Sequence, residues 1–318
     1  MAKSQQLVAL IFMMAVAVLS VFAALSFGAA NIPFFEVVQV LTSTASEQSV
    51  FNQQIIWQLR MPRTLLAFLA GSGLAISGLI LQTVTRNPLA DPYLFGISSG
   101  ASFGVVILVA LIGSNASFAM SGAAFIGSLA ATVMLLFIAG NSRHQQVETM
   151  LLAGVALSFL FSSLTSFLLY LTDPQAVTAI LFWTMGSFTR AEWQTLWAPA
   201  VVIVGCTLVM IGYRRQLNAM LMGDESATTL GINVKRFRIT MLLLSSLITA
   251  VLVSMCGGIG FVGLMIPHIV RFFVSQGSGY GMLLTAGAGG IFMVWVDVLA
   301  RIISVSYTHL TLPTTSRV

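Results

Sequence analysis

The chain has 318 residues, of which 58% are hydrophobic and only 7% are charged, and its mean hydropathy is +0.97. Soluble domains carry about 25% charged residues, so this composition excludes a soluble protein and predicts an integral membrane protein. The net charge of +5 does not indicate nucleic-acid binding, because the basic residues fall at the ends of apolar segments and not on one face. At about 20 apolar residues per span, the length allows roughly nine or ten membrane-spanning helices.

The first apolar stretch, residues 7–29, predicts a membrane-spanning helix. It has no A-x-A cleavage pattern ahead of a soluble domain, so a retained helix is favoured over a signal peptide. Residues 31–57 are more polar and predict an outer segment with a short helix along the membrane surface. Cys206 and Cys256 lie in apolar runs, which indicates core residues and not a disulfide or a metal pair.

Residues 65–83 predict the second span, and their many small side chains permit close helix packing. A polar turn follows, in which two prolines, an asparagine and an aspartate break the helix. This turn contains Arg86, Asn87, Pro88, Asp91 and Pro92. We expect it to lie on the inner side of the membrane.

Four further apolar stretches predict spans at residues 93–112, 118–139, 149–171 and 194–213. Residues 141–148 predict a short inner turn, in which His144 is expected to be solvated and not to bind a metal. Residues 180–185 are apolar but too short to cross a membrane, which predicts a re-entrant or surface helix on the outer side.

The longest polar segment of the chain, residues 217–238, cannot lie in lipid because its charges are too costly there. Asp224 and Glu225 stand in the first turn of a short predicted helix, where acidic side chains favour the helix dipole. Gly231 suits the end of that helix, and basic residues then lead back to the membrane. A solvated loop without special function is the alternative interpretation.

Residues 239–255 predict the seventh span and residues 283–300 the ninth, with an interrupted eighth between them. Residues 257–271 begin with four glycines in seven positions, which disfavours an ordinary helix. Broken helices occur at membrane depth where they are buried or line a cavity, although tight packing of small residues explains the glycines equally well. We expect His268 to bond a carbonyl freed near Pro267, in preference to relaying protons.

The distribution of basic residues predicts the orientation. If the amino end is inside and the spans alternate, four basic residues fall outside, namely Arg60, Arg63, Arg190 and Arg301. Nine fall inside: Lys3, Arg86, Arg143, Arg214, Arg215, Lys235, Arg236, Arg238 and Arg271. This excess satisfies the positive-inside rule and predicts a cytoplasmic amino terminus and a cytoplasmic polar segment.

Several strings in this sequence resemble those of FecCD-type, BtuC-like permeases, the membrane subunits of ABC importers for iron–siderophore, haem, cobalamin and related metal-bearing cargo. The strings are RMPRT before the second span, RNPLADP followed by GISSG after it, LLAGVALS in the fifth span, LNAMLMGDESATTLGINVKRFR, and GGIGFVGLMIPHIVR. The resemblance covers roughly residues 55 to 303. It implies an all-α bundle forming a single permease domain over residues 1–305, in the bacterial inner membrane.

The resemblance also implies which residues meet partners. Residues 214–238 would form a cytoplasmic coupling segment against a separate ATPase subunit, through Leu221, Gly223, Asp224, Glu225, Ala227, Leu230 and Gly231. Arginines at the outer ends of spans would dock a periplasmic binding protein, namely Arg60, Arg63 and Arg301. Snorkelling of these arginines toward head groups is the simpler reading. The motif turns would be structural, through Arg86, Asn87, Pro88, Asp91, Pro92, Gly260, Gly263, Pro267 and His268.

No catalytic set, zinc spacing or phosphate loop is present in the sequence, so neither enzyme activity nor a metal or cofactor bound by this chain is expected. ATP and Mg²⁺ would be bound by the partner ATPase, and a second permease copy or paralogue would complete the pathway, with contributions from the second, fifth and eighth spans. Ferric siderophore is the first cargo expected, ahead of cobalamin, haem or molybdate. The alternatives are an ion-coupled secondary transporter, which needs intramembrane acids or histidines paired across spans, and a structural membrane scaffold.

Residues 306–318 do not fit this family, whose members continue into one more span. They are polar, threonine-rich and too short to cross the membrane, which predicts a truncated or foreign tail. The expectation is therefore nine spans, with the carboxyl end outside.

Overall fold

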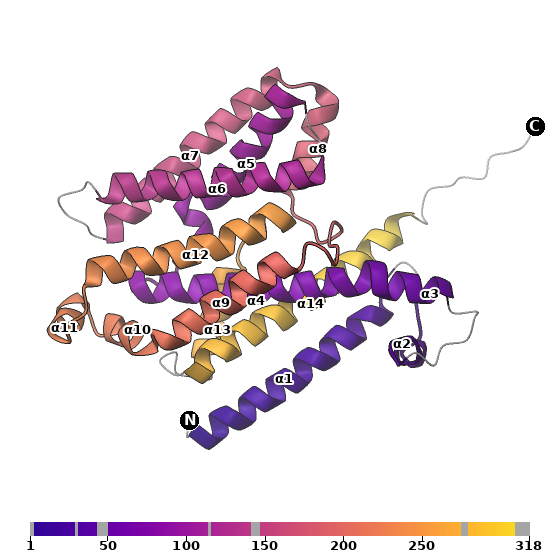
Figure 1. The fold of residues 1–318 in the computed structure, drawn as a ribbon, viewed down its shortest axis with the longest axis horizontal. Helices are drawn as coiled ribbons and strands as arrows, with labels where there is room; N and C mark the ends of the chain where they lie inside the picture. Colours follow the sequence, from indigo (N-terminus) through magenta and orange to yellow (C-terminus); the bar gives the residue numbers. More distant parts are fainter. Residues whose placement is uncertain are drawn as a thin grey trace, which may run out of the picture.

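A computed structural model describes residues 3–28, 31–42, 50–113, 116–140, 147–274 and 279–308, and within these ranges the chain is helical with no strand (Figure 1). The helices of the first half are α1 (Lys3–Ser26), α2 (Phe34–Leu41), α3 (Val50–Gln54), η2 (Ile55–Arg60), α4 (Met61–Thr85), η3 (Pro92–Phe95), α5 (Ile97–Ile107), η4 (Leu108–Ile112) and α6 (Ser117–Gly140). Those of the second half are α7 (Val147–Leu171), α8 (Pro174–Thr184), α9 (Trp197–Gly212), α10 (Arg214–Leu221), α11 (Asp224–Thr229), α12 (Val234–Cys256), α13 (Val262–Arg271) and α14 (Gly279–Thr308).

The helices long and apolar enough to cross a membrane number six within the described ranges, or seven if the bent pair α9–α10 is one span. Two shorter apolar helices, residues 97–112 and 262–271, coincide with the third and eighth predicted spans. The predicted membrane-spanning bundle is therefore confirmed, but the count of nine spans is not.

Two expectations concern residues outside the described part of the chain. The predicted inner turn with His144 and Arg143 falls largely in residues 141–146, and most of the predicted tail falls in residues 309–318. The final helix α14 runs through the expected domain boundary at residue 305 and ends at Thr308.

Helix α4 lies at the centre of the bundle, and 83% of its most apolar stretch is buried inside this single chain. It packs against α12, α13 and α14, and small side chains make the close approach possible. A side chain added at Gly71 would overlap the backbone of Gly289 on α14, and one added at Gly78 would overlap the backbone of Gly263 on α13. The second span is thus a core helix, so most of it cannot line a path between two copies, contrary to expectation.

Replacing Gly78 with alanine should therefore destabilise the protein by about 1–3 kcal/mol, because helices α4 and α13 must separate to admit the methyl group. Thermal unfolding of the purified protein in detergent would measure the loss. Gly205→Ala is the matched control, since nothing lies within 4 Å of its added Cβ. Equal melting temperatures for the two variants would contradict this packing.

The helix that contains the second predicted span begins earlier than the apolar stretch at residues 65–83. Residues 50–85 form one continuous helical stretch, in which the π-helical turn η2 ends directly before Met61 and Pro62. A proline lacks the N–H that a regular α-helix would use, and a π-helical turn shifts the hydrogen-bond pattern where such an interruption occurs. Arg60 therefore ends the π-helical turn, and Arg63 lies in the first turn of α4.

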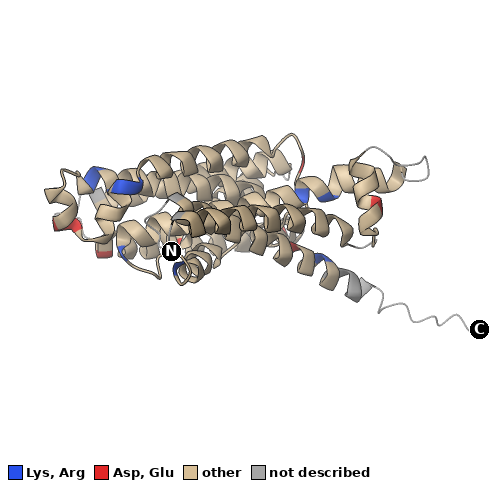
Figure 2. Cartoon of the chain, turned by 90° about the horizontal axis from the view of Figure 1, so that it is seen from below, with Lys and Arg blue, Asp and Glu red and all other residues tan. Residues whose placement is uncertain are grey.

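Hydroxyl groups tie α4 to α12 in the interior. The Ser77 hydroxyl lies 2.6 Å from that of Ser245 and 2.9 Å from that of Thr249, and all three side chains are buried. Charged residues, in contrast, gather toward the two ends of the bundle and leave its middle uncharged (Figure 2). This separation is the pattern of a protein whose middle lies in lipid.

Candidate functional site

The predicted coupling segment (residues 214–238) contains the short helices α10 and α11 and the start of α12, and α11 is the short helix that its acids and Gly231 predicted. Helix α10 bends by 66° from α9 and buries Leu217, Ala219 and Met220. Helix α11 begins after Gly223, whose φ of 116° is accessible to glycine but strained for other residues, and carries two acids in its first turn. Gly231, with a φ of 81°, follows its end.

Asp224 connects the coupling segment to the rest of the protein. Its carboxylate accepts hydrogen bonds of 3.1 and 3.0 Å from the buried guanidinium of Arg238 and forms a 3.3 Å ion pair with Arg86. Arg238 also donates to the carbonyl of Val84 at 3.3 Å. The turn after α4, the start of α12 and the start of α11 thus meet at one acid, which connects α11 to two long helices.

The other predicted coupling residues divide into a buried and an exposed group. Ala227 is fully buried and anchors α11. Glu225, Leu221 and Leu230 are exposed, so their side chains are accessible to a partner. The two acids of α11 consequently have different surroundings: Asp224 is held internally, whereas Glu225 faces outward.

The polar turn after α4 is ordered by its own side chains. Asn87 accepts a hydrogen bond from the backbone N–H of Leu89 at 2.9 Å, and Asp91 accepts one from that of Tyr93 at 2.8 Å. Burial raises the pKa of the Asp91 carboxyl, and the Tyr93 N–H partly opposes this shift. The left-handed conformation of Arg86, with φ 51°, directs the chain into the turn. These contacts order the turn, and the structural role of the motif stays a prediction.

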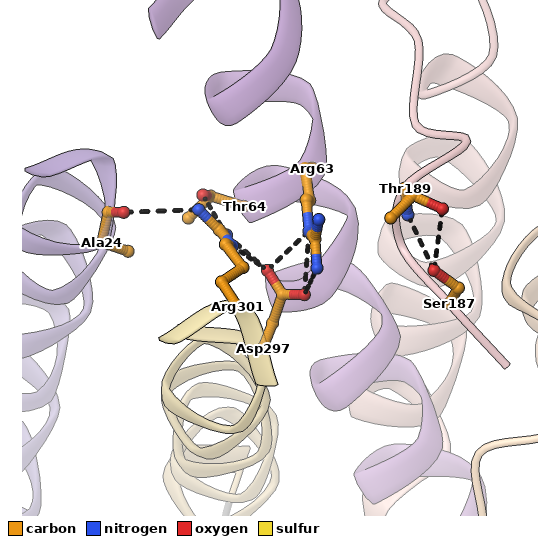
Figure 3. Close-up of polar contacts among 7 residues, drawn as sticks. All are labelled: Ala24, Arg63, Thr64, Ser187, Thr189, Asp297 and Arg301. Atoms are coloured by element: carbon orange, nitrogen blue, oxygen red, sulfur yellow. Dashed lines mark hydrogen bonds and ion pairs between the residues drawn. The ribbon is translucent and has the colours of Figure 1, made fainter. Parts of the chain in front are cut away.

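Two of the three arginines predicted to dock a partner, Arg63 and Arg301, converge on one acid that was not predicted as their partner (Figure 3). Asp297 on α14 accepts bonds of 2.9 and 2.7 Å from Nε and Nη2 of Arg63. It also pairs with Arg301, which donates to the hydroxyl of Thr64 at 3.1 Å. Arg60 donates to the carbonyl of Leu25 at 2.6 Å. The cluster therefore joins α1, α4 and α14.

The exposure of Arg60, Arg63 and Arg301 is relevant to their predicted role in docking a binding protein. The whole residues Arg60 and Arg301 are 6% and 8% exposed, whereas the side chain of Arg63 is 23% exposed. Only Arg63 presents a substantial part of its side chain to the surface of the single chain. Docking by the three arginines stays a prediction.

The glycine-rich stretch between α12 and α13 is unwound, as expected for a broken helix. Residues 257–261 leave the helical conformation, and the backbone N–H of Ile259 donates to the Tyr93 hydroxyl at 2.7 Å. The carbonyl of Cys256, at the end of α12, accepts a hydrogen bond of 2.7 Å from the backbone N–H of Ser187. The hydroxyl of the same Ser187 lies 2.9 Å from that of Thr189 (Figure 3). The freed backbone groups thus find partners inside the protein.

The prediction for His268 is wrong. Its side chain is exposed, and its ring contacts Phe272 edge-on at 5.3 Å; it forms no hydrogen bond with any described residue. Pro267 lies inside α13, one turn before the end of that helix. A histidine directed away from the bundle does not meet the carbonyls freed by this proline.

A groove of about 430 Å³ lies between α5, α7 and α8, close to the unwound stretch. Nine of its twelve lining residues carry a hydroxyl, and none carries a charge. Helix α5 contributes Ser98, Ser99 and Ser102, and helix α7 contributes Ser158, Ser162, Thr165 and Ser166. Tyr93, which holds Ile259, also lines the groove. We name this feature the hydroxyl groove.

The hydroxyl groove was not predicted from the amino-acid sequence, from which no cargo contacts were expected at named residues. The available signal was the spacing on α7, where serines and threonine at positions 158, 162, 165 and 166 share one helical face. A matching set begins α5 inside the GISSG string. The spacing alone could not show that the two faces oppose each other.

Comparisons with known proteins show which family the chain belongs to. The FecCD transport family model matches residues 16–314. The chain belongs to the FecCD transport family. It is 38% identical over 249 residues to the cobalamin import permease BtuC of Halobacterium salinarum, covering 78% of this chain and 67% of that protein. It is 35% identical to the hemin transport permease HmuU of Yersinia pestis, covering 87% of this chain and 84% of that protein.

A solved structure has the same fold. It is described as an inward-facing conformation of a metal-chelate type ABC transporter, and it superposes with a TM-score of 0.81 at 28% identity, over 94% of this chain and 91% of that one. This FecCD permease is therefore an integral membrane transport component and not an enzyme. Permeases of ABC importers work with a separate ATPase and a substrate-binding protein, and they dimerise. The resemblance stated from the sequence is confirmed.

Proposed function

We propose that this FecCD permease moves ferric siderophores through the inner membrane, as one of two permease subunits above a pair of ATPase subunits. The observation that carries the proposal is the connection through Asp224, which ties the exposed coupling segment to α4 and α12. ATP binding would move α10 and α11, and the long helices would then alternate access to the pathway as rigid bodies.

The proposed orientation places the coupling segment in the cytoplasm together with the amino terminus. In Figure 1 the chain begins at the end of the bundle where α10 and α11 lie, and α2 and α3 lie at the opposite end. The excess of basic residues predicted for the inner side supports this orientation. The binding protein would then dock at the end that carries Arg60, Arg63 and Arg301.

Arg63 is the docking residue that the geometry favours most. Asp297 has two guanidinium partners, so the cluster retains a net positive charge, and the Arg63 side chain is its partly exposed member. A carboxylate on the binding protein could accept from the guanidinium groups that Asp297 leaves free, because arginine offers five donors. Asp297 would keep Arg301 throughout.

The test measures ATP hydrolysis in lipid nanodiscs by the permease and its ATPase subunit, with and without the binding protein. We expect the binding protein to stimulate hydrolysis by the intact complex. Arg63→Gln should abolish that stimulation and leave the basal rate unchanged. Arg190→Glu, at an exposed arginine placed at the same end, should keep the stimulation.

Two results would overturn different parts of the proposal. Full stimulation of the Arg63→Gln complex would remove Arg63 from the docking surface. An intact permease that never assembles with the ATPase subunit, but takes up cargo along a proton or sodium gradient, would replace the importer by a secondary transporter.

A further inference from the structure

The hydroxyl groove has a chemistry that restricts what it can bind, and we infer that it is a binding site for uncharged metal chelates rich in carbonyl, amide or hydroxamate oxygens. The inference rests on the proposed function and specifies its cargo. It follows from three observations: the unpartnered hydroxyls, their arrangement, and the absence of charge among the residues that line the groove.

Several hydroxyls of the groove have no partner within the described part of the chain. The side-chain hydroxyls of Ser98, Ser102, Ser162 and Ser166 form no hydrogen bond there, and the buried Oγ1 of Thr165 is also unsatisfied. A hydroxyl can both donate and accept, and a polar group without a partner is costly at membrane depth. These side chains are therefore free to bond a polar molecule in transit.

The hydroxyls are arranged in two rows, so that several of them can bond the same ligand. Ser98 and Ser102 are one turn apart on α5, and Ser162 and Ser166 are one turn apart on α7, so two stripes flank the same space. The groove borders the unwound stretch, because a Cβ added at Gly258 would lie 3.6 Å from the Ser98 hydroxyl. Irregular backbone of this kind is tolerated where it lines a cavity.

The absence of charge among the lining residues determines the ligand class. An anion removed from water is costly unless a cationic partner offsets its charge. The groove offers neither a lysine nor an arginine, and its hydroxyls serve donors and acceptors equally. A neutral chelate with oxygen and N–H groups on its surface matches this lining, whereas an oxyanion or an anionic chelate does not.

The occupant could instead be a helix of the second permease copy, since serine and threonine hydroxyls also join helices in membranes. The volume of about 430 Å³ open beside α7 suits a polar ligand that passes through. The experiment below separates these two occupants.

The test uses the permease in lipid nanodiscs, with and without its ATPase subunit, and a cysteine reporter, Ser166→Cys. The two native cysteines, Cys206 and Cys256, are buried. Ferrichrome, a neutral ferric trihydroxamate, should slow maleimide labelling of the reporter, whereas anionic ferric enterobactin and molybdate should not. A Ser163→Cys reporter, on the exposed surface of α7 and outside the groove, should label at the same rate with every probe.

A second substitution tests the hydroxyls themselves. Adding Ser162→Ala to the reporter should raise the ferrichrome concentration for half-protection roughly 3- to 10-fold, the effect of one lost hydrogen bond. Adding Ser163→Ala should leave it unchanged.

Three outcomes would overturn the inference: protection by the anionic probes, protection by none of the probes, or a permease that becomes monomeric when Ser162 is replaced. The last would assign the groove to the second copy. ATPase assembly and its stimulation by the binding protein are measured on the permease with native Ser162, so failure of this inference is distinguishable from failure of the proposed function.

Discussion

Replacing Asp297 with alanine is expected to lower the free energy of unfolding by about 3–5 kcal/mol, the cost of leaving buried charges without a counter-ion. The side chains of Asp297 and Arg301 are 3% and 7% exposed, and Arg63 binds the same carboxylate through two nitrogens. Without the acid, the guanidinium groups of Arg63 and Arg301 would lose the carboxylate that they share. Thermal unfolding in detergent or nanodiscs would measure the loss.

Two variants show whether the cost arises from the unpaired charge. Arg63→Gln leaves Asp297 paired with Arg301, so we expect a loss of only about 1–2 kcal/mol, as for one charged hydrogen-bonding partner removed near the surface. Combining Asp297→Leu with Arg301→Met removes both charges and should recover much of the stability, because apolar replacement of a buried pair is often neutral. A fully stable Asp297→Ala protein would contradict the assigned role of the cluster.

Replacing Asp224 with alanine should uncouple the permease from ATP hydrolysis. Arg238 is buried and would lose its only acidic partner among the described residues, and Arg86 would lose the ion pair that connects the polar turn to α11. We expect a loss of about 1–3 kcal/mol in stability, less than for Asp297 because the Asp224 side chain is 42% exposed. Uptake of cargo into proteoliposomes per ATP hydrolysed would measure the coupling.

The neighbouring acid provides the matched comparison. Glu225 stands next to Asp224 in the first turn of α11, but it is exposed and forms no bond within the described chain. Glu225→Ala should therefore change stability by less than about 0.5 kcal/mol, and Glu225→Lys should weaken assembly with the ATPase without changing the melting temperature. If Asp224→Ala and Glu225→Ala had the same stability and the same coupling, the internal connection through Asp224 would have no function.

The features that could be predicted from the sequence are those set by residues close together in the chain. Apolar runs of sufficient length predicted the helical bundle, because a lipid-exposed backbone must satisfy its hydrogen bonds within each helix. The acids and glycines around residues 223–231 predicted α11 and its end, and the glycines at residues 257–263 predicted the unwound stretch. The exact lengths were less well predicted: η2 extends α4 outward, and α5 and α13 are shorter than a full span.

The candidate sites depended on the tertiary structure, because their members are brought together only when helices pack. Arg63 and Asp297 are 234 positions apart, and their pairing requires α4 and α14 to lie side by side at a particular rotation. The hydroxyl groove likewise needs the serine faces of α5 and α7 to oppose each other. The amino-acid sequence alone therefore determined a multi-span membrane bundle with a polar segment at one end and a broken helix. Helix packing alone decided which charges are paired and which hydroxyls remain free, because those depend on which helix faces meet.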